Sequence, residues 1–166
     1  MAHFTDRRKT RKSILLTLLV ICGLSVSMVL AGTAGSDNAP GQGQEGKLRV
    51  NIRISIGSTI MVATLEDNPT ARDFATLLPL TVTLRDFSAA EKVSGALPKH
   101  LSEDGAPATD AGAVGDIAYY APWGNIAFYR GRGPDASGVI KIAKIISGIE
   151  ALNQQGNVRA TISRND

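Results

Sequence analysis

The side chains of this 166-residue chain best suited to binding a ligand are gathered in one aromatic stretch. Successive strand residues point to opposite faces, so one member of each adjacent aromatic pair is expected in the core. The other members, with the sole Trp in a turn between two strands, can line a groove. Packing of a barrel wall is the competing interpretation. The candidate ligand-binding residues are Tyr119, Tyr120, Trp123, Asn125, Phe128, Tyr129 and Arg130.

The other polar residues give weaker support for a catalytic centre. His100 could act as a general base, although an exposed loop histidine is the simpler interpretation. The only other histidine is His3, so a histidine-based metal cluster is excluded. No Gly-x-Ser-x-Gly elbow is present, and hydrolase chemistry is therefore unsupported. We expect neither a metal nor a cofactor.

Three further motifs each have a structural interpretation beside a functional one. Residues 131–133 with Gly138 superficially resemble a phosphate loop, but the Gly-Lys-Ser/Thr ending is missing, which favours a flexible loop. Glu91 and Lys92 could form an acid–base pair. Neighbours on a helix point to different sides, however, which favours a helix cap and a solvated lysine. Asp116 is either a buried carboxylate or a turn residue.

The basic character of the chain belongs to its first residues. The net charge is +3, yet five basic residues precede position 13, with Asp6 as the only acid among them. From Gly35 onward, 13 Lys and Arg residues are balanced by 14 Asp and Glu residues. Scattered, balanced charge does not favour nucleic-acid binding, so we expect no nucleic-acid partner.

The N-terminus has the pattern of an export segment. Residues 14–31 form an apolar run after the basic residues, and small residues follow at 31–34, as in a secretory signal. An uncleaved anchor is the alternative, because these 18 residues nearly span a bilayer core of ~30 Å. Either segment places the rest of the chain outside the cytoplasmic membrane, and it provides the only expected membrane contact.

The composition divides the chain into three parts. We expect a signal peptide or anchor at 1–34, a flexible Gly- and Gln-rich linker at 35–46, and one domain at 47–166. The only cysteine is Cys22, inside the apolar run, so the domain has no disulfide. A lipoprotein signal ending at Cys22 is the weaker interpretation, because Ile21 is too large for the residue before it.

Alternation of apolar and polar residues predicts several half-buried strands. It is strict from Lys47 to Ile56, and the Gly57-Ser58 turn then leads to a second strand, so a hairpin is expected. The aromatic stretch should form another hairpin around Pro122–Asn125. The further strands are predicted at residues 59–65, 80–84, 117–121, 126–130, 139–146 and 158–162.

Helices and loops are predicted between these strands. Asn68 and Pro69 suit the N-cap and first position of a helix that ends before Pro79. Ser and Glu three residues apart, at 88–91 and at 147–150, predict two short helical segments. Long loops are expected at residues 94–115 and 131–138.

Seven or eight strands without regular strand–helix alternation argue against a doubly wound parallel sheet. A mainly β fold is expected, a closed antiparallel barrel capped by one or two short helices, because closure removes exposed strand edges.

A series of motifs resembles the small bacterial and archaeal cyclophilin-like domain proteins. The match covers residues 47–164, and the stretch from 115 to 125 is its most specific part. The resemblance implies a cyclophilin-type eight-stranded barrel with helices closing its ends. The motifs are NPTARDF (68–74), LLP (77–79), EK (91–92), LP (97–98), GDIAYYAPWGN (115–125) and GIEAL (148–152).

True cyclophilins are peptidyl-prolyl isomerases, but their FHR-, QGGD- and FxMAN-type segments have no counterpart in this sequence. The resemblance therefore implies the barrel without a mechanism. The leader and the aromatic stretch together favour an exported module that binds a small molecule or an extended peptide. The alternative is a diverged isomerase that takes a proline-containing peptide. In that case the aromatic residues would hold the proline ring, and Arg130 or Arg53 would supply the hydrogen-bond donor.

Export can be tested on protein from the native host. N-terminal sequencing should give a start near Gly32–Gly35, or the intact chain should sediment with membranes. Full-length chain recovered from the soluble cytoplasm would contradict the predicted export.

Overall fold

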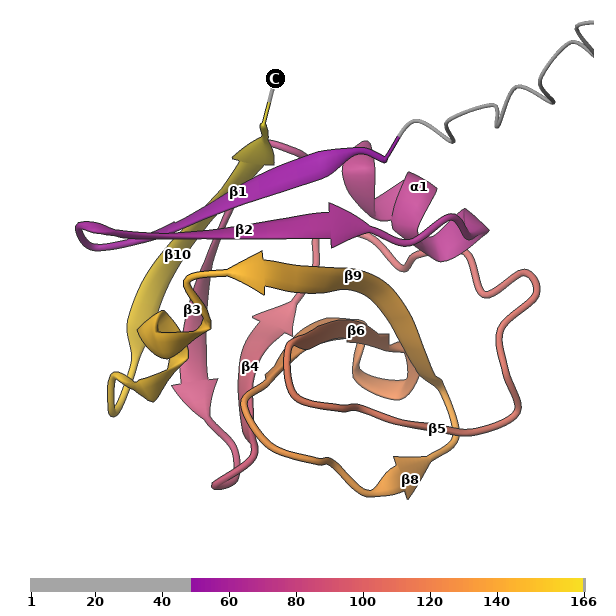
Figure 1. The fold of residues 1–166 in the computed structure, drawn as a ribbon. Coiled ribbons are helices and arrows are strands. Elements are labelled where there is room, and N and C mark those ends of the chain that lie inside the picture. The colour runs from indigo at the N-terminus through magenta and orange to yellow at the C-terminus, as the bar shows by residue number, and fades with distance from the viewer. Residues whose placement is uncertain (1–48, 166) are drawn as a thin grey trace, which may run out of the picture. The chain divides into compact units, whose positions relative to one another are not determined.

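Eight antiparallel strands of the computed structural model close into a barrel (Figure 1). The structure describes residues 49–165, so the predicted leader and linker at 1–46 lie outside the described residues. Around the barrel the strand order is β1-β10-β3-β4-β7-β6-β9-β2. The barrel strands are β1 (Asn51–Ile56), β2 (Thr59–Leu65), β3 (Leu80–Asp86), β4 (Glu91–Ala96), β6 (Asp116–Tyr120), β7 (Asn125–Tyr129), β9 (Val139–Ser147) and β10 (Val158–Arg164).

The predicted closed eight-stranded barrel is therefore confirmed. One α-helix, α1 (Pro69–Ala75), and two 3₁₀ helices, η1 (Ala121–Trp123) and η2 (Ile149–Asn153), complete the described secondary structure, with the short strands β5 (Asp110–Ala111) and β8 (Asp135–Ala136). Within residues 49–165, no helix has the length and apolar character needed to cross a membrane.

The first hairpin follows the alternation of its sequence. Ile52, Ile54 and Ile56 are buried in the barrel, whereas Arg53 between them is exposed. β1 pairs with β2 as predicted. The strand begins at Asn51, and Val50 before it is 41% exposed, whereas the predicted start at Lys47 lies outside the described residues.

Helix α1 begins where the sequence predicts. The Asn68 side chain accepts a hydrogen bond from the Ala71 backbone N–H at 2.8 Å, as an N-cap does. The same side chain donates to the Lys141 carbonyl oxygen at 2.8 Å, which ties the helix start to β9. Phe74, fully buried, brings the inner face of the helix into the core.

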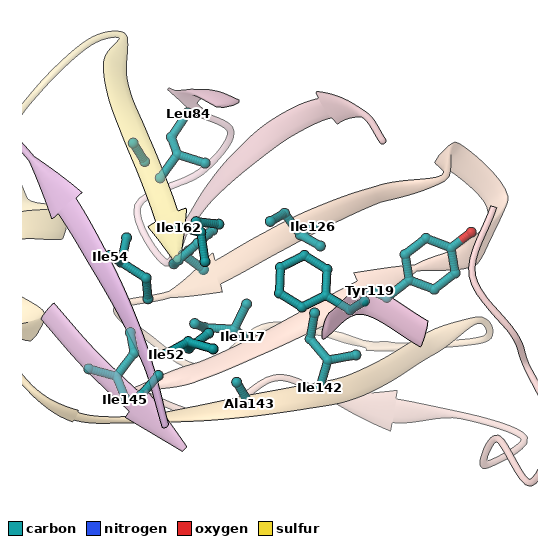
Figure 2. Close-up of a cluster of buried hydrophobic side chains, with 14 of the residues drawn as sticks. Ile52, Ile54, Leu84, Ile117, Tyr119, Ile126, Ile142, Ala143, Ile145 and Ile162 are labelled. Carbon is teal, nitrogen blue, oxygen red and sulfur yellow. The ribbon is translucent and has the colours of Figure 1, made fainter. Parts of the chain in front are cut away.

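Isoleucine and aromatic side chains fill the interior of the barrel (Figure 2). Leu84 and Ala143 are among the labelled side chains of this cluster, beside seven isoleucines and Tyr119. The Tyr119 ring lies at one side of this cluster, and its hydroxyl points away from the isoleucines (Figure 2). That hydroxyl accepts a hydrogen bond from the Leu101 backbone N–H at 3.3 Å and lies 3.1 Å from His100 Nδ1.

The helical turn predicted at 88–91 is wrong, because these residues form the turn of the β3–β4 hairpin. The Glu91 N–H donates to the Ser88 carbonyl oxygen at 3.4 Å, and the Phe87 N–H donates to the Glu91 oxygen at 3.0 Å. Ser and Glu three residues apart suit a β-turn as well as a capping box, and the strand pairing decides between them. Strand β4 therefore takes residues 91–96, part of which the sequence assigned to a loop.

The capping box predicted at residues 147–150 is not formed as expected. A short helix, η2, is present, but Gly148 is its N-cap, with φ of +78° and no side-chain hydrogen bond. A Cβ atom on this residue would overlap the backbone oxygen of Ile60. Glycine is thus required here by both conformation and space.

The two segments predicted as loops, 94–115 and 131–138, lie side by side and pair with each other through short strands. β5 and β8 pair antiparallel as a separate two-stranded sheet, with Asp110 opposite Ala136. The Gly133 N–H donates to the Gly112 carbonyl oxygen at 2.8 Å, which joins the two segments again. The glycine-rich stretch is followed by β8 and does not open a helix, so it lacks the arrangement of a phosphate loop.

The register of β1 generates a stability test. Ile54→Asp should lower the free energy of unfolding by about 4 kcal/mol or more, because it buries an unpaired charge. Arg53→Glu, on the exposed face of the same strand, should change it by about 0.5 kcal/mol or less. Urea denaturation of both variants measures the difference. Equal tolerance would show that the strand faces are assigned incorrectly.

Candidate functional site

A second hydrophobic cluster covers the outer face of the barrel. It consists of side chains from β4, β6, β7 and β9, and Tyr120 and Ala136 pack against it. Cross-strand pairing aligns them, since Val93 lies opposite Ala127 and Ala127 lies opposite Ala118. An apolar row on the outer face of a barrel needs a cover. The cluster is Val93, Ala118, Ala127, Tyr129 and Val139.

A hollow of about 170 Å³ opens beside this cluster. Aromatic and small apolar side chains make most of its wall, and the polar groups are few, as in typical ligand sites. Strands β4, β6 and β7 supply its base, and the β8 segment supplies one side. It is lined by Phe87, Glu91, Val93, Tyr120, Trp123, Asn125, Ala127, Tyr129, Pro134, Ala136 and Val139.

Tyr129 forms a rigid part of this wall. A Cβ atom on Gly112 or on Gly133 would overlap its ring, so both positions accept only glycine without rearrangement. The glycine-rich loop therefore serves to enclose Tyr129, which is 4% exposed. Burial and the nearby carboxylates, Glu91 first among them, raise the pKa of Tyr129 to about 12. The phenol accordingly stays protonated at neutral pH.

Asn125 is held at the base of the hollow by an irregularity in β4. The pairing of β4 with β7 shifts between Val93 and Ala96. At this bulge Asn125 Nδ2 donates to the Ser94 carbonyl oxygen at 3.0 Å, and the Ile126 N–H donates to Ser94 Oγ at 3.1 Å. Bulges of this kind aim side chains at functional sites.

The side-chain oxygen of Asn125 has no hydrogen-bond partner in the described part of the chain. The residue is only 3% exposed. A buried polar atom without a partner costs free energy, about 1–3 kcal/mol, and therefore requires an explanation.

Glu91 is the second unusual polar group of the hollow. It is 7% exposed, and among residues 49–165 its carboxylate makes neither a hydrogen bond nor an ion pair. Burial raises its pKa above the ordinary value of 4.5. Its neighbour Lys92 points to the opposite face of β4 and is fully buried, so the solvated lysine expected from the sequence is wrong.

The rim of the hollow is aromatic and open. Trp123 is 49% exposed and Phe87 is 53% exposed. The Trp123 ring meets Phe87 and Tyr120 edge to face, with centroid distances of 5.6 Å and 5.3 Å. Half of the only Trp side chain thus remains uncovered by the rest of the described chain.

The aromatic pairs divide between the two faces as the alternation predicted. Tyr119 and Phe128 point inward and are fully buried in the core. Tyr120 and Tyr129 point outward and line the hollow, together with Trp123. With Asn125, four of the seven candidate residues therefore lie at this one place.

Arg130 lies apart from the hollow, and its guanidinium is used within the fold. Nε donates to the Ala89 carbonyl oxygen at 2.9 Å, and Nη1 donates to that of Leu152 at 2.9 Å. Nη2 donates to Asp86 Oδ1 at 2.9 Å and to the Ser88 carbonyl oxygen at 3.0 Å. It clamps η2 to the β3–β4 turn.

Asp86 also joins the buried lysine. Lys92 Nζ lies 2.9 Å from Asp86 Oδ1 and donates to the Gly156 carbonyl oxygen at 2.8 Å. The Gly156 N–H donates to Asp86 Oδ2 at 2.6 Å. These hydrogen bonds, that of Lys92 first, hold the pKa of Asp86 below its ordinary value.

Asp116, another single candidate, is held in ion pairs within the fold. Asp116 is buried, and its Oδ1 lies 2.7 Å from Lys144 Nζ. Burial raises the pKa of Asp116, but the hydrogen bonds from Lys144 and the Ala113 N–H bring it below its ordinary value. Among residues 49–165, no three His, Cys, Asp or Glu side chains are grouped to hold a metal ion.

Two other hollows lie elsewhere on the domain. One of about 630 Å³ is lined by residues that include Arg49, Arg72 and Arg164. One of about 240 Å³ lies beside α1, next to Asn68 and Thr70. Both have mainly polar or exposed linings, and neither contains an unpartnered buried atom, so the aromatic hollow is the stronger candidate.

Sequence reasoning missed the lining residues outside the aromatic stretch. Phe87 and Val93 flank residues 88–91, which were assigned to a helical turn, and Pro134 and Ala136 belong to a stretch assigned to a flexible loop. Residues 91–96 show no period-two alternation of apolar and polar side chains, so the sequence carried no clear signal for strand β4.

Comparison with known proteins agrees with this architecture. The family model described as "Cyclophilin-like family" matches residues 54–163. The solution structure of a hypothetical protein from Archaeoglobus fulgidus is similar, with a TM-score of 0.53 and 20% identity. That match covers 73% of this chain and 98% of the archaeal one, and at this identity it concerns the fold. No curated protein matches the chain.

The isolated carboxylate of Glu91 generates a pH prediction. Because its folded-state pKa is raised, the associated stability is present below about pH 4.5 and is lost as the pH rises through the folded-state value. Glu91→Gln should therefore increase the free energy of unfolding at neutral pH by about 1 kcal/mol. Urea denaturation at several pH values measures this, with exposed Glu103→Gln as the control. A loss of stability in Glu91→Gln would show that the carboxylate has a stabilising partner.

Proposed function

Because this chain belongs to the cyclophilin-like family, we propose that its barrel is an exported binding module. The ligand is a small molecule or an extended peptide that places an apolar group in the outer aromatic hollow. The proposed location rests on the basic and apolar leader, which would carry the domain across the cytoplasmic membrane.

The observation that carries the proposal is the unsatisfied wall of the hollow. Asn125 Oδ1 is buried without a partner, and Glu91 is buried without a counter-ion among the described residues. Groups of this kind reduce stability, so the presence of both in the lining of one apolar hollow supports a ligand at this place. The half-exposed Trp123 and Phe87 add apolar surface at the entrance.

A diverged peptidyl-prolyl isomerase is the second candidate. Family membership and an apolar hollow of about 170 Å³ favour it, because a proline ring needs such a pocket. An isomerase also needs a hydrogen-bond donor beside the pocket, and neither arginine predicted for this role supplies one. The donors of Arg130 are all directed to Asp86 and backbone carbonyls, and Arg53 lies on β1, which does not line the hollow.

Nuclear magnetic resonance titration tests the binding site. We use two probes, 2-phenylethanol and the peptide acetyl-Ala-Ala-Pro-Phe-amide. Both should shift amide signals of residues 87–93 and 120–129. Trp123→Ala should weaken binding about tenfold, as loss of an aromatic anchor does. It should change the free energy of unfolding by only about 1 kcal/mol or less, because half of the side chain is exposed.

Ile60→Ala is the matched control, since Ile60 is 40% exposed on β2, away from the hollow. Binding that responds equally to both substitutions would contradict the proposed site. Exchange spectroscopy on the same peptide separates the two candidates. Catalysis at the proline bond would favour the isomerase over the binding module, whereas binding at an unchanged isomerisation rate would favour the module.

A further inference from the structure

We propose that the hollow selects a ligand whose apolar group carries a positively charged nitrogen, an ammonium or a guanidinium, with Glu91 as its counter-ion. This inference rests on the proposed function, because it assigns the ligand class for the same hollow. It adds a specificity-determining residue that the aromatic stretch does not contain.

The lining of the hollow has one charged side chain, and it is negative. Glu91 is an acid, and no Lys, Arg or His side chain contributes to the wall. Asn125 adds a buried acceptor oxygen, since its Nδ2 is already used by the Ser94 carbonyl. Glu91 pairs with Tyr129 and Asn125 pairs with Ala96, so the two acceptors lie at different ends of the hollow. The carboxylate of Glu91 is therefore the group that matches a ligand with N–H donors and a positive charge.

Lys92 and Arg130, two cations close to Glu91, are paired with Asp86. Lys92 lies on the inner face and pairs with Asp86 at 2.9 Å. The Arg130 guanidinium lies 2.9 Å from the same aspartate. Arg132 is exposed on the loop and forms no ion pair with Glu91. The fold thus keeps its own positive charges away from this carboxylate.

The acidic residues near β9 are also paired with basic residues. Lys141 lies 3.4 Å from Asp116 and 3.6 Å from Asp110, and Lys144 lies 2.7 Å from Asp116. The other acids near Tyr129 are therefore neutralised by lysines. Glu91 remains the carboxylate without a counter-charge among the described residues of this face.

The aromatic rim favours the same ligand. Rings of Trp, Tyr and Phe attract cations to their faces, and the attraction increases when water is excluded. Tyr120, Trp123 and Phe87 form a contiguous group at the entrance. An anionic ligand would instead meet a like charge in a poorly hydrated wall, which is strongly unfavourable.

Three probes that share a phenylethyl group test the charge preference: 2-phenylethylamine, 2-phenylethanol and 3-phenylpropionate. Calorimetric titration should show that the amine binds about tenfold more tightly than the alcohol, and that the acid binds most weakly. Glu91→Gln should remove the difference, so that the amine and the alcohol bind with the same affinity. Glu103→Gln, which removes the same charge from an exposed loop, should preserve the preference.

Peptide probes identify the source of the cation. Acetyl-Gly-Lys-Gly-amide is compared with the same peptide containing norleucine. Tighter binding of the lysine peptide than of 2-phenylethylamine would assign the hollow to basic peptides, and the reverse would assign it to free amines. Either result supports the inference, provided that Glu91→Gln removes the advantage of the charged probe.

Two results would overturn the inference. If the amine and the alcohol bind equally, and Glu91→Gln changes neither affinity, the hollow binds apolar groups without charge selection, and the proposed function stands. If no probe binds, and none shifts a signal from the hollow, both the inference and the proposed function are wrong.

Discussion

Closure of the eight strands assigns each side chain of the barrel wall to one of two faces. The inner face has no access to water, so it takes isoleucines and the rings of Tyr119 and Phe128. Chemistry that needs water or a ligand must therefore use the outer face. Adjacent residues of one strand, such as Tyr119 and Tyr120, consequently have unrelated roles, one in the core and one in the hollow.

The same alternation separates Glu91 from Lys92, although the two are neighbours in the sequence. Lys92 enters the barrel and meets Asp86, which also binds Arg130 and the Gly156 N–H. A fully buried lysine is tolerated because its charge is paired and hydrogen-bonded. Asp86 thus pairs with both Lys92 and Arg130. Neither cation is then available to the carboxylate of Glu91 on the outer face.

The cover of the outer face comes from segments with little secondary structure. Gly112 and Gly133 approach the Tyr129 ring so closely that only hydrogen atoms fit, and the β5–β8 pair holds them there. A loop that packs in this way is part of the site wall. The unsatisfied groups beside it reduce stability, which is the usual cost of a surface prepared for a ligand.

The amino-acid sequence by itself determined the barrel, the first hairpin, the Asn68 cap and the aromatic hairpin, because period-two alternation, caps and turns are local patterns. Family motifs pointed to the same fold. It could not determine that Glu91 begins a strand, since Ser88 to Glu91 suits a turn and a cap equally, and pairing with β7 decides. It also could not determine that a glycine-rich loop encloses Tyr129. The aromatic part of the hollow was predictable from residue type, whereas Phe87, Glu91 and the unpartnered oxygen of Asn125 depend on contacts between segments distant in sequence, which only the tertiary structure decides.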